Sequence, residues 1–298
     1  MVKNRRKILL AVDGSDKAFK AVRYVSELFP PNRMEVILFH VMTKVPENFW
    51  DIEKEPVYKH KIAAISAWEL QQKKEQQDFI ERARQLFLDR NFAEDAVSIK
   101  IQERKVGIAR DIVNESRNDY YGVVVGRWGK SMLKDYLWGS IANKLLGRLT
   151  HVPLCVVGGA PQIDKILVAI DASKGAMRAV DYVGTMADST NWEVTLFHAV
   201  RGLDREKLHE AEKSMESVFE EAHRYLEKAG FNRKQITTKL VTGVTSRALA
   251  ISMEALNGGY GTIVVGRRGL SNVEEFTIGR VSNKVIHMAR EIAVWVVA

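Results

Sequence analysis

Residues 7–25, KILLAVDGSDKAFKAVRYV, return in closely similar form as residues 165–183, KILVAIDASKGAMRAVDYV, and this repeat decides the architecture of the chain. Each copy opens with a short apolar run that ends at Asp13 or Asp171 and is followed by apolar residues at helical spacing. A continuous apolar run predicts a strand buried on both faces, and the spacing after it predicts a helix. The chain therefore contains one unit twice.

Two further matches extend the repeat. Residues 35–41 (EVILFHV) match 193–199 (EVTLFHA) at the same offset of 158, and residues 124–129 (VVGRWG) match 264–269 (VVGRRG) at an offset of 140. The first copy therefore has about 18 extra residues, within the stretch 42–77. The junction, residues 158–161 (GGAP), has turn-forming composition. We expect two domains, residues 1–158 and 162–298.

Strands and helices alternate along each copy. This order predicts parallel strands with right-handed crossovers, and so two tandem doubly wound α/β domains of Rossmann-like type, each a five-stranded parallel sheet flanked by helices. Such sheets bind ligands beyond the carboxyl ends of the strands, where the strand order reverses. The predicted strands include residues 8–12, 36–41, 97–101, 123–125 and 154–157, then 236–241, 263–265 and 294–297; the predicted helices include 16–28, 64–89, 108–116 and 207–228.

Composition fits a globular protein. Hydrophobic residues make up 46% of the 298 residues and charged residues 28%. No apolar run approaches the roughly 20 residues of a membrane-spanning helix, so we expect no membrane partner. The single cysteine, Cys155, lies in an apolar strand and has no internal disulfide partner, which favours the reducing cytoplasm.

The net charge of +8 is unevenly distributed. Residues 1–160 carry 27 Lys and Arg against 20 Asp and Glu, a net +7, whereas the remainder carries +1. The local excess is strongest in residues 104–148, with nine basic and four acidic residues. Such an excess indicates either an anionic ligand or an ordinary solvated basic face. The nearly neutral second copy makes nucleic acid an unlikely partner.

The segment with this excess contains a glycine pattern. Gly126 and Gly129 follow a buried strand, and Gly139 and Ser140 come after nine intervening residues. Glycine after a strand lets backbone approach a ligand closely. Ser140 opens an apolar periodic stretch, and a helix N-terminus attracts phosphate through its unpaired amides and its dipole. The alternative explanation is ordinary turn and capping glycines.

The second copy repeats the spacing with one change. Gly266, Gly269 and Gly279 keep the intervals, although the nine residues inside the longer interval have diverged, and Arg280 replaces the serine. Survival of the spacing favours a functional explanation. Arg280 either grips a phosphate itself or fills the pocket and pairs with Asp171 or Glu275. Nucleotide binding in this copy is therefore left open.

The pattern G-x2-G-x9-G-[S/T], with AVDGS after the first strand and His-Val at the end of the second, resembles the ATP-binding members of the universal stress protein family. The resemblance covers nearly the whole chain, twice. It implies a protein that binds ATP, ADP or AMP, with or without Mg, and has a regulatory or protective role in stress. It implies no catalytic residue and no metal-ligating residue of the protein.

The resemblance also assigns positions. Asp13 would contact the ribose, the backbone at Val41 would lie at the adenine edge, and the remaining positions would surround the phosphates: Gly126, Gly129, Gly139, Ser140 and Ile141, with added charge from Arg127. A possible second site comprises Asp171, Ala199, Gly266, Gly269, Gly279 and Arg280. Asp13 has a second, compatible role as a cap of the following helix, which begins near Ser15.

Three alternatives stay open at this point. The fold can serve as a nucleotide-free scaffold for dimerisation or protein partners, as a slow ATPase, or as a nucleic-acid binder whose affinity falls steeply with salt. The closing strands, residues 154–157 and 294–297, leave apolar sheet edges. In single-domain members of the resembled family such strands pair between subunits. We therefore expect these strands to pair within the chain, with the two copies packed face to face about a pseudo-two-fold axis, and a homodimer as a further possibility.

Overall fold

The computed structural model describes residues 5–43, 59–127, 140–159, 164–186, 192–202, 205–269 and 277–298. Its first half contains β1 (Arg6–Ala11), α1 (Asp16–Leu28), β2 (Met34–Met42), α2 (Lys59–Asp89), β3 (Val97–Glu103), α3 (Ile108–Glu115), β4 (Gly122–Gly126), α4 (Ser140–Leu146) and β5 (Leu154–Val157). The second half repeats this order with β6 (Lys165–Ala169), α5 (Lys174–Met186), β7 (Glu193–Arg201), α6 (Arg205–Lys228), β8 (Ile236–Val244), α7 (Arg247–Asn257), β9 (Thr262–Gly266), α8 (Arg280–Met288) and β10 (Ala293–Val297). The predicted alternation of strands and helices is confirmed.

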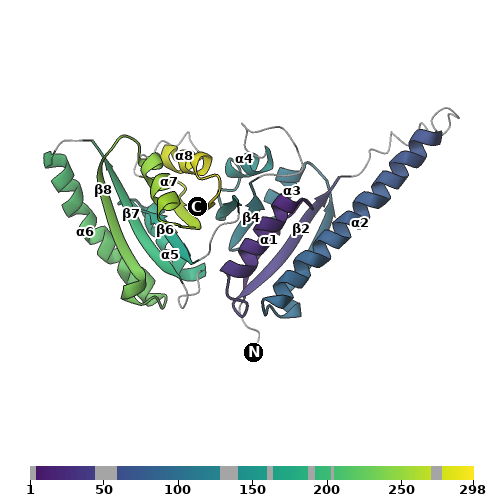
Figure 1. Cartoon of the computed structure of the whole chain (residues 1–298), viewed down its shortest axis with the longest axis horizontal. Coiled ribbons are helices and arrows are strands. Elements are labelled where there is room, and N and C mark those ends of the chain that lie inside the picture. Colours follow the sequence, from purple (N-terminus) through teal and green to yellow (C-terminus); the bar gives the residue numbers. More distant parts are fainter. Residues whose placement is uncertain are drawn as a thin grey trace.

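The ten strands form one continuous sheet in the order β3-β2-β1-β4-β5-β10-β9-β6-β7-β8 (Figure 1). Within each half the five strands are parallel, as predicted. The halves are joined by antiparallel pairing of β5 with β10, in which Cys155 lies opposite Trp295. The sheets therefore meet edge to edge and not face to face, because the closing strands satisfy each other's backbone hydrogen-bonding groups.

The opening unit illustrates how the sequence produces these elements. Ile8, Leu9 and Leu10 of β1 are each 0% exposed, and burying such a side chain contributes about 1.5–3 kcal/mol. The hydroxyl of Ser15 caps α1 by accepting a hydrogen bond from the Ala18 amide at 3.1 Å. The helix ends at Leu28, and its C-cap Phe29 has an extended backbone because Pro30 follows it.

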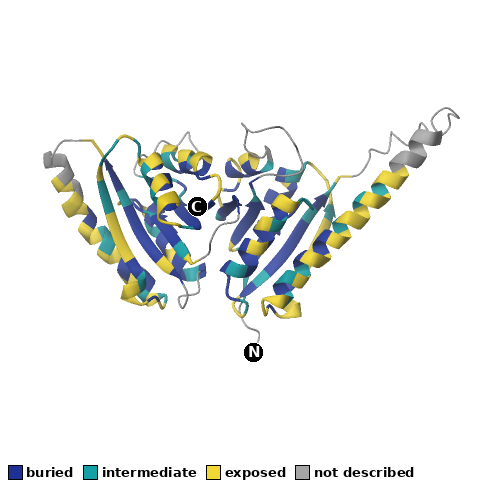
Figure 2. Ribbon diagram, in the orientation of Figure 1, coloured by how far each residue is buried: buried dark blue, intermediate teal, exposed yellow. Residues whose placement is uncertain are grey.

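Helices cover both faces of the sheet (Figures 1 and 2). Helices α1, α2, α5 and α6 pack on one face, and α3, α4, α7 and α8 pack on the other. Side chains of β1 alternate between the two layers, with Ile8 and Leu10 in one and Leu9 in the other. Each layer is a single hydrophobic cluster with residues from both halves. The two halves therefore share their core.

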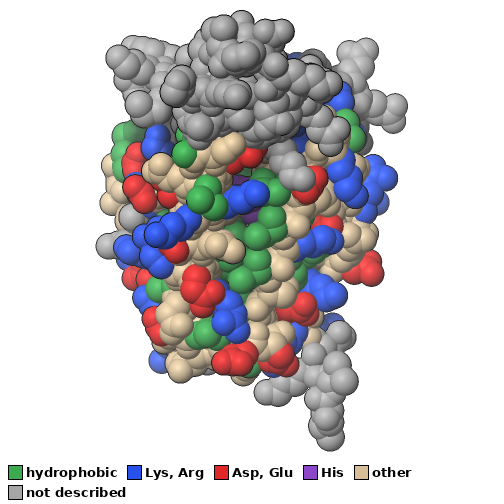
Figure 3. All heavy atoms as spheres, turned by 90° about the vertical axis from the view of Figure 1, so that its right-hand side faces the viewer, with side chains coloured by type: hydrophobic (Ala, Val, Ile, Leu, Met, Phe, Trp, Pro, Cys, Tyr) green, Lys and Arg blue, Asp and Glu red, His purple; other side chains and the backbone are tan. Residues whose placement is uncertain are grey.

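The outer edges of the sheet are β3 and β8. Beside β3, helix α2 has 31 residues against 24 in α6 and projects beyond the sheet (Figure 1). Figure 3 shows this end of the molecule, where apolar side chains lie between charged ones; Ile99 of β3 is 41% exposed. Lys100 pairs with Glu115 at 2.7 Å, and on the opposite edge Lys239 pairs with Glu254 at 2.7 Å. Charged side chains on both edges disfavour strand pairing between chains.

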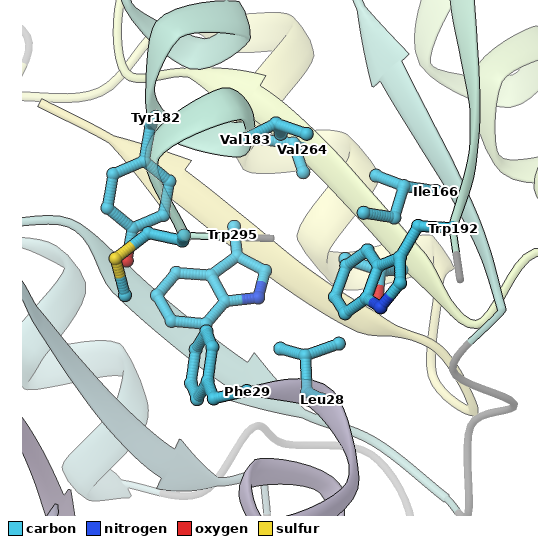
Figure 4. A pocket seen from close by; sticks show the side chains of 10 residues that line it. Leu28, Phe29, Ile166, Tyr182, Val183, Trp192, Val264 and Trp295 are labelled. Atoms are coloured by element: carbon cyan, nitrogen blue, oxygen red, sulfur yellow. The ribbon is translucent and has the colours of Figure 1, made fainter. Parts of the chain in front are cut away.

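Aromatic side chains fill the junction between the halves. The Tyr24 hydroxyl of α1 lies 2.9 Å from the Thr262 hydroxyl of β9, and the Trp295 indole donates to Tyr24 at 2.8 Å. Trp295 also contacts Phe29 edge-on, with ring centroids 5.9 Å apart, and lies against Tyr182 (Figure 4). A cavity of about 20 Å³ adjoins these rings, which is room for roughly one water molecule.

Candidate functional site

Each half has a switch point where the strand order reverses. In the first half β1 lies between β2 and β4, and the chain leaves the switch point in one direction through β2 and β3 and in the other through β4 and β5. Asp13 follows β1, and Gly126 ends β4, which pairs directly with β1. In the second half Asp171 and Gly266 occupy the same places on the paired strands β6 and β9. The predicted site residues at the ends of these strands are thus brought together.

The carboxylate of Asp13 is held in place by the turn that follows it. Its Oδ1 accepts hydrogen bonds from the Ser15 amide at 3.0 Å and from the Ser15 hydroxyl at 2.6 Å. Ser15, and not Asp13, is the N-cap of α1. In the second half Asp171 Oδ1 accepts the Ser173 amide at 3.0 Å in the same way. Both carboxylates are therefore fixed at the strand end by a local turn.

A histidine braces each of these turns. The Nδ1 atom of His40 lies 2.8 Å from the Val12 carbonyl, and that of His198 lies 2.7 Å from the Ile170 carbonyl. Since a carbonyl only accepts, each Nδ1 carries the proton. Burial lowers the pKa of His198, which keeps the ring neutral. Both histidines are thus bound to the backbone at a strand end, and no group of three or more potential metal ligands occurs among the described residues.

Two glycines of the second half are explained by close approach. A Cβ on Gly269 would lie 2.8 Å from Asp171 Oδ2, so the loop backbone passes directly against this carboxylate. A Cβ on Gly266 would lie 2.6 Å from the Gly175 carbonyl carbon at the start of α5. Gly266 is therefore needed for helix packing, whether or not a ligand binds beside it.

The first turn of helix α8 lies beside the carboxyl end of β9. Its N-cap, Gly279, provides no side-chain cap, and its amide donates to the Arg267 carbonyl at 2.8 Å. The Ser282 hydroxyl donates to the Gly266 carbonyl at 2.7 Å and anchors the first turn to the strand. Arg280 is exposed and, in the described part of the chain, forms no salt bridge with Asp171. Arg280 therefore does not fill the candidate site by pairing with Asp171. The other expected partner, Glu275, lies outside the described residues.

The first-half site is described in part. Ser140 is the first residue of α4, and Ile141 packs against the hydrophobic layer beneath it. Gly129 and Gly139 lie outside the described residues. Val41 is buried near the end of β2, where the sequence analysis places the adenine edge.

The matching strand end in the second half, at Ala199 of β7, already has a side-chain donor bound to its backbone. The carbonyl of Ala199 accepts a hydrogen bond from Arg247 Nε at 3.2 Å. The matching position in the first half is Ile108, at the start of α3, and its side chain has no donor. The ends of β2 and β7 therefore differ in the hydrogen-bonding groups beside them.

Arg127 does not occupy the place that sequence reasoning gave it. Its side chain is 1% exposed and crosses to the other half, where it donates to the carbonyls of Ile286 and Ala289, each at 2.7 Å. The guanidinium is directed at the end of α8 and not at a phosphate of its own half. The missed signal was the recurrence of the same dipeptide, Gly-Arg, in both copies, with Arg267 as the counterpart.

These features define a duplicated parallel α/β protein with a candidate ligand site at the switch point of each half. A family model described as the universal stress protein family matches residues 4–158 and 162–298. The chain therefore belongs to the universal stress protein family, with the family unit present twice. In the described residues, every helix is too short or too polar to cross a membrane.

Two solved structures that are similar over nearly the whole chain show the same fold. A universal stress protein from Archaeoglobus fulgidus DSM 4304 is similar over 100% of this chain and 99% of its own, with a TM-score of 0.62 and 19% identity. A functionally unknown protein from Pseudomonas aeruginosa PAO1 matches over 99% and 93%, with a TM-score of 0.54 and 16% identity. A universal stress protein in complex with cAMP matches 45% of this chain and 97% of its own, with a TM-score of 0.38 and 22% identity. No curated protein matches the chain.

Proposed function

We propose that this chain binds an adenine nucleotide, ATP or its relatives ADP and AMP, with or without Mg, at the switch point of its first half. Asp13 would contact the ribose hydroxyls, and the backbone at Val41 would border the adenine. The peptide groups of the loop and of the first turn of α4 would hold the phosphates: Gly126, Gly129, Gly139, Ser140 and Ile141. Arg127 is left out of this set because its side chain is committed to α8.

The observation that carries the proposal is the position of Asp13 beside Gly126. A carboxylate fixed by Ser15 at the end of β1 is suited to accept hydrogen bonds from ribose hydroxyls and to repel phosphate. The phosphates would then lie toward the glycine loop and the N-terminus of α4, where amides donate. Family membership supports this division of the site.

We propose that the two halves bind unequally, with the first half the stronger site. Ser140 completes the glycine pattern, whereas Arg280 interrupts it. The Ala199 carbonyl at the second adenine edge already accepts a bond from Arg247. Arg280, which is exposed at the start of α8, would contact a phosphate there. The second half, containing Asp171, Gly266, Gly269 and Gly279, would accordingly favour a shorter anionic nucleotide with weaker affinity.

The proposed role is nucleotide sensing or storage in the cytoplasm, with a regulatory or protective part in stress. The proposed domains are residues 1–158 and 162–298, and they would act as one unit because β5 and β10 pair within the chain. This internal pairing would take the place of the pairing between subunits that single-domain proteins of this kind would need. It also favours a nucleotide-free scaffold as the second candidate function.

A glycine substitution separates the two candidates. Gly129→Val puts a branched side chain where phosphate must approach backbone, and we expect ATP affinity, measured by titration calorimetry, to fall at least about a hundredfold. Gly147→Val is the matched control, because a Cβ at Gly147 meets only the Lys144 carbonyl, at 3.9 Å. Unchanged ATP affinity in folded Gly129→Val protein would refute the loop assignment and leave the scaffold.

A further inference from the structure

The arginines that follow Gly126 and Gly266 make reciprocal contacts across the junction. Arg127 of the first half donates to the carbonyls of Ile286 and Ala289, each at 2.7 Å. These two carbonyls lie in the last turn of α8 and immediately after it. The first glycine loop is thus tied to the carboxyl end of the second half's last helix.

Arg267 makes the mirror contacts. It donates to the carbonyl of Leu146 at 2.9 Å and to that of Leu149, at and just beyond the end of α4. It also donates to the Thr277 carbonyl of its own half at 3.0 Å. Leu146 and Leu149 are separated from Ile286 and Ala289 by the same offset of 140 that separates the two arginines. The contacts therefore obey the pseudo-two-fold relation of the halves.

The chemistry of these contacts suits a permanent tie. The last carbonyls of a helix lack partners within it and carry the negative end of its dipole, so a cation placed there is stabilised. A guanidinium spans two carbonyls with the fixed geometry of its planar fork, whereas an ammonium is a compact, strongly hydrated point charge on a flexible stem. Arg127 and Arg267 are 1% and 5% exposed, and burial lowers the pKa of each to about 10, so both remain cationic at neutral pH.

Each of these two helices is bound at its carboxyl end by an arginine of the other half, while its N-terminus lies in the candidate site of its own half. Helix α4 starts at Ser140 in the first site, and its carboxyl end is held by Arg267 from the second loop. Helix α8 starts at Arg280 in the second site, and its carboxyl end is held by Arg127 from the first loop. The loop of one half and the phosphate-facing helix of the other are therefore mechanically connected, in both directions.

We propose that Arg127 and Arg267 are positioning residues that make each nucleotide site depend on the loop of the opposite half. Arg267 supports the first site although it belongs to the second half, and Arg127 supports the second. This inference rests on the proposed function for its ligand, but the tie itself concerns only the protein. Because binding linkage is reciprocal, nucleotide in one site would also change the affinity of the other.

Arg267→Met provides the test, since it removes the charge and the donors but keeps an unbranched side chain. In the full chain we expect the amides of α4 to exchange hydrogen faster and the first-half ATP affinity, measured by calorimetry, to fall about tenfold. Arg127→Met should instead speed exchange in α8. Arg233→Met is the control, because Arg233 is an exposed arginine of the second half with ion pairs to Glu220 and Glu227, and it should change neither helix.

The outcomes separate the two claims. Unchanged exchange in α4 and unchanged first-half affinity in folded Arg267→Met protein would overturn the inference, as would equal acceleration of both helices by either variant. If the wild-type chain binds no adenine nucleotide, the proposed function fails; selective acceleration of α4 would then still support the tie. Should Arg267→Met not fold, Arg267→Lys is used. It should show an intermediate loss of α4 protection, and wild-type protection would overturn the inference.

Discussion

The same substitution at two equivalent tyrosines is expected to lower stability at one of them and not at the other. Tyr24 and Tyr182 are related by the offset of 158. The Tyr24 hydroxyl bonds to Thr262 at 2.9 Å and accepts from Trp295 at 2.8 Å. The Tyr182 hydroxyl is buried and, among the described residues, has no hydrogen-bond partner. The equivalent of Thr262 is Gly122, and a Cβ there would lie only 2.7 Å from the Tyr182 hydroxyl.

The magnitudes follow from these contacts. Tyr24→Phe leaves the buried Thr262 hydroxyl and Trp295 indole N–H unpaired, and at about 1–3 kcal/mol for each orphaned group the loss of unfolding free energy should be about 2–6 kcal/mol. Tyr182→Phe removes a hydroxyl that was buried without a partner, so the unfolding free energy should stay constant or rise by about 1 kcal/mol. The two rings are otherwise similar in size and location.

Urea unfolding of the full chain, followed by far-ultraviolet circular dichroism, measures both changes on one scale. Each variant serves as the steric control for the other, since each loses one oxygen from a ring in the junction. Equal losses of stability in the two variants would refute the reasoning, as would a stabilised Tyr24→Phe.

Three further predictions concern the turns, the strand ends and the second site. The pKa of His198 is lowered by burial below its unfolded value of about 6.5, so the unfolded chain binds the proton more readily and stability should fall as pH drops below about 6.5; His198→Gln should flatten this slope in urea unfolding at a series of pH values. Gly266→Ala should lower the melting temperature through overlap with the Gly175 backbone, even without nucleotide, whereas an unchanged melting temperature would contradict the packing explanation. Arg280→Ser should weaken nucleotide binding in the second half, because exposed Arg280 is expected to contact a phosphate; a stoichiometry that rises toward two nucleotides per chain in calorimetry would show that Arg280 blocks the site instead.

The fold was predictable because the same pattern of apolar runs and helical spacing occurs in both copies. Buried strands such as β1 and β4 are short apolar runs, and both copies place them in the same order. The resemblance predicted contact between the closing strands, but whether the sheets then meet by their faces or by their edges was not predictable from this pattern. An apolar closing strand is compatible with packing by its face or pairing by its edge, and only backbone hydrogen bonds between β5 and β10 distinguish the two.

The site was predictable where the local sequence determines it. Asp13 and Asp171 stand directly after strands, so their place at the switch point follows from the topology. The sequence left both Asp13 and Ser15 as candidates for the N-cap of α1, and in the structure the N-cap is Ser15. The assignment of Arg127 failed because the carbonyls that attract it belong to a helix about 160 residues away, in the other half. No local pattern contains that information.

The central claim is that this chain holds an adenine nucleotide in its first half. Mass spectrometry under native conditions, applied to the purified full chain and repeated after denaturation, measures both the number and the identity of bound nucleotides. We expect one tightly bound adenine nucleotide per chain, released on denaturation and lost in Gly129→Val. A chain that carries no adenine nucleotide, and takes up none when ATP, ADP or AMP is added, would contradict it.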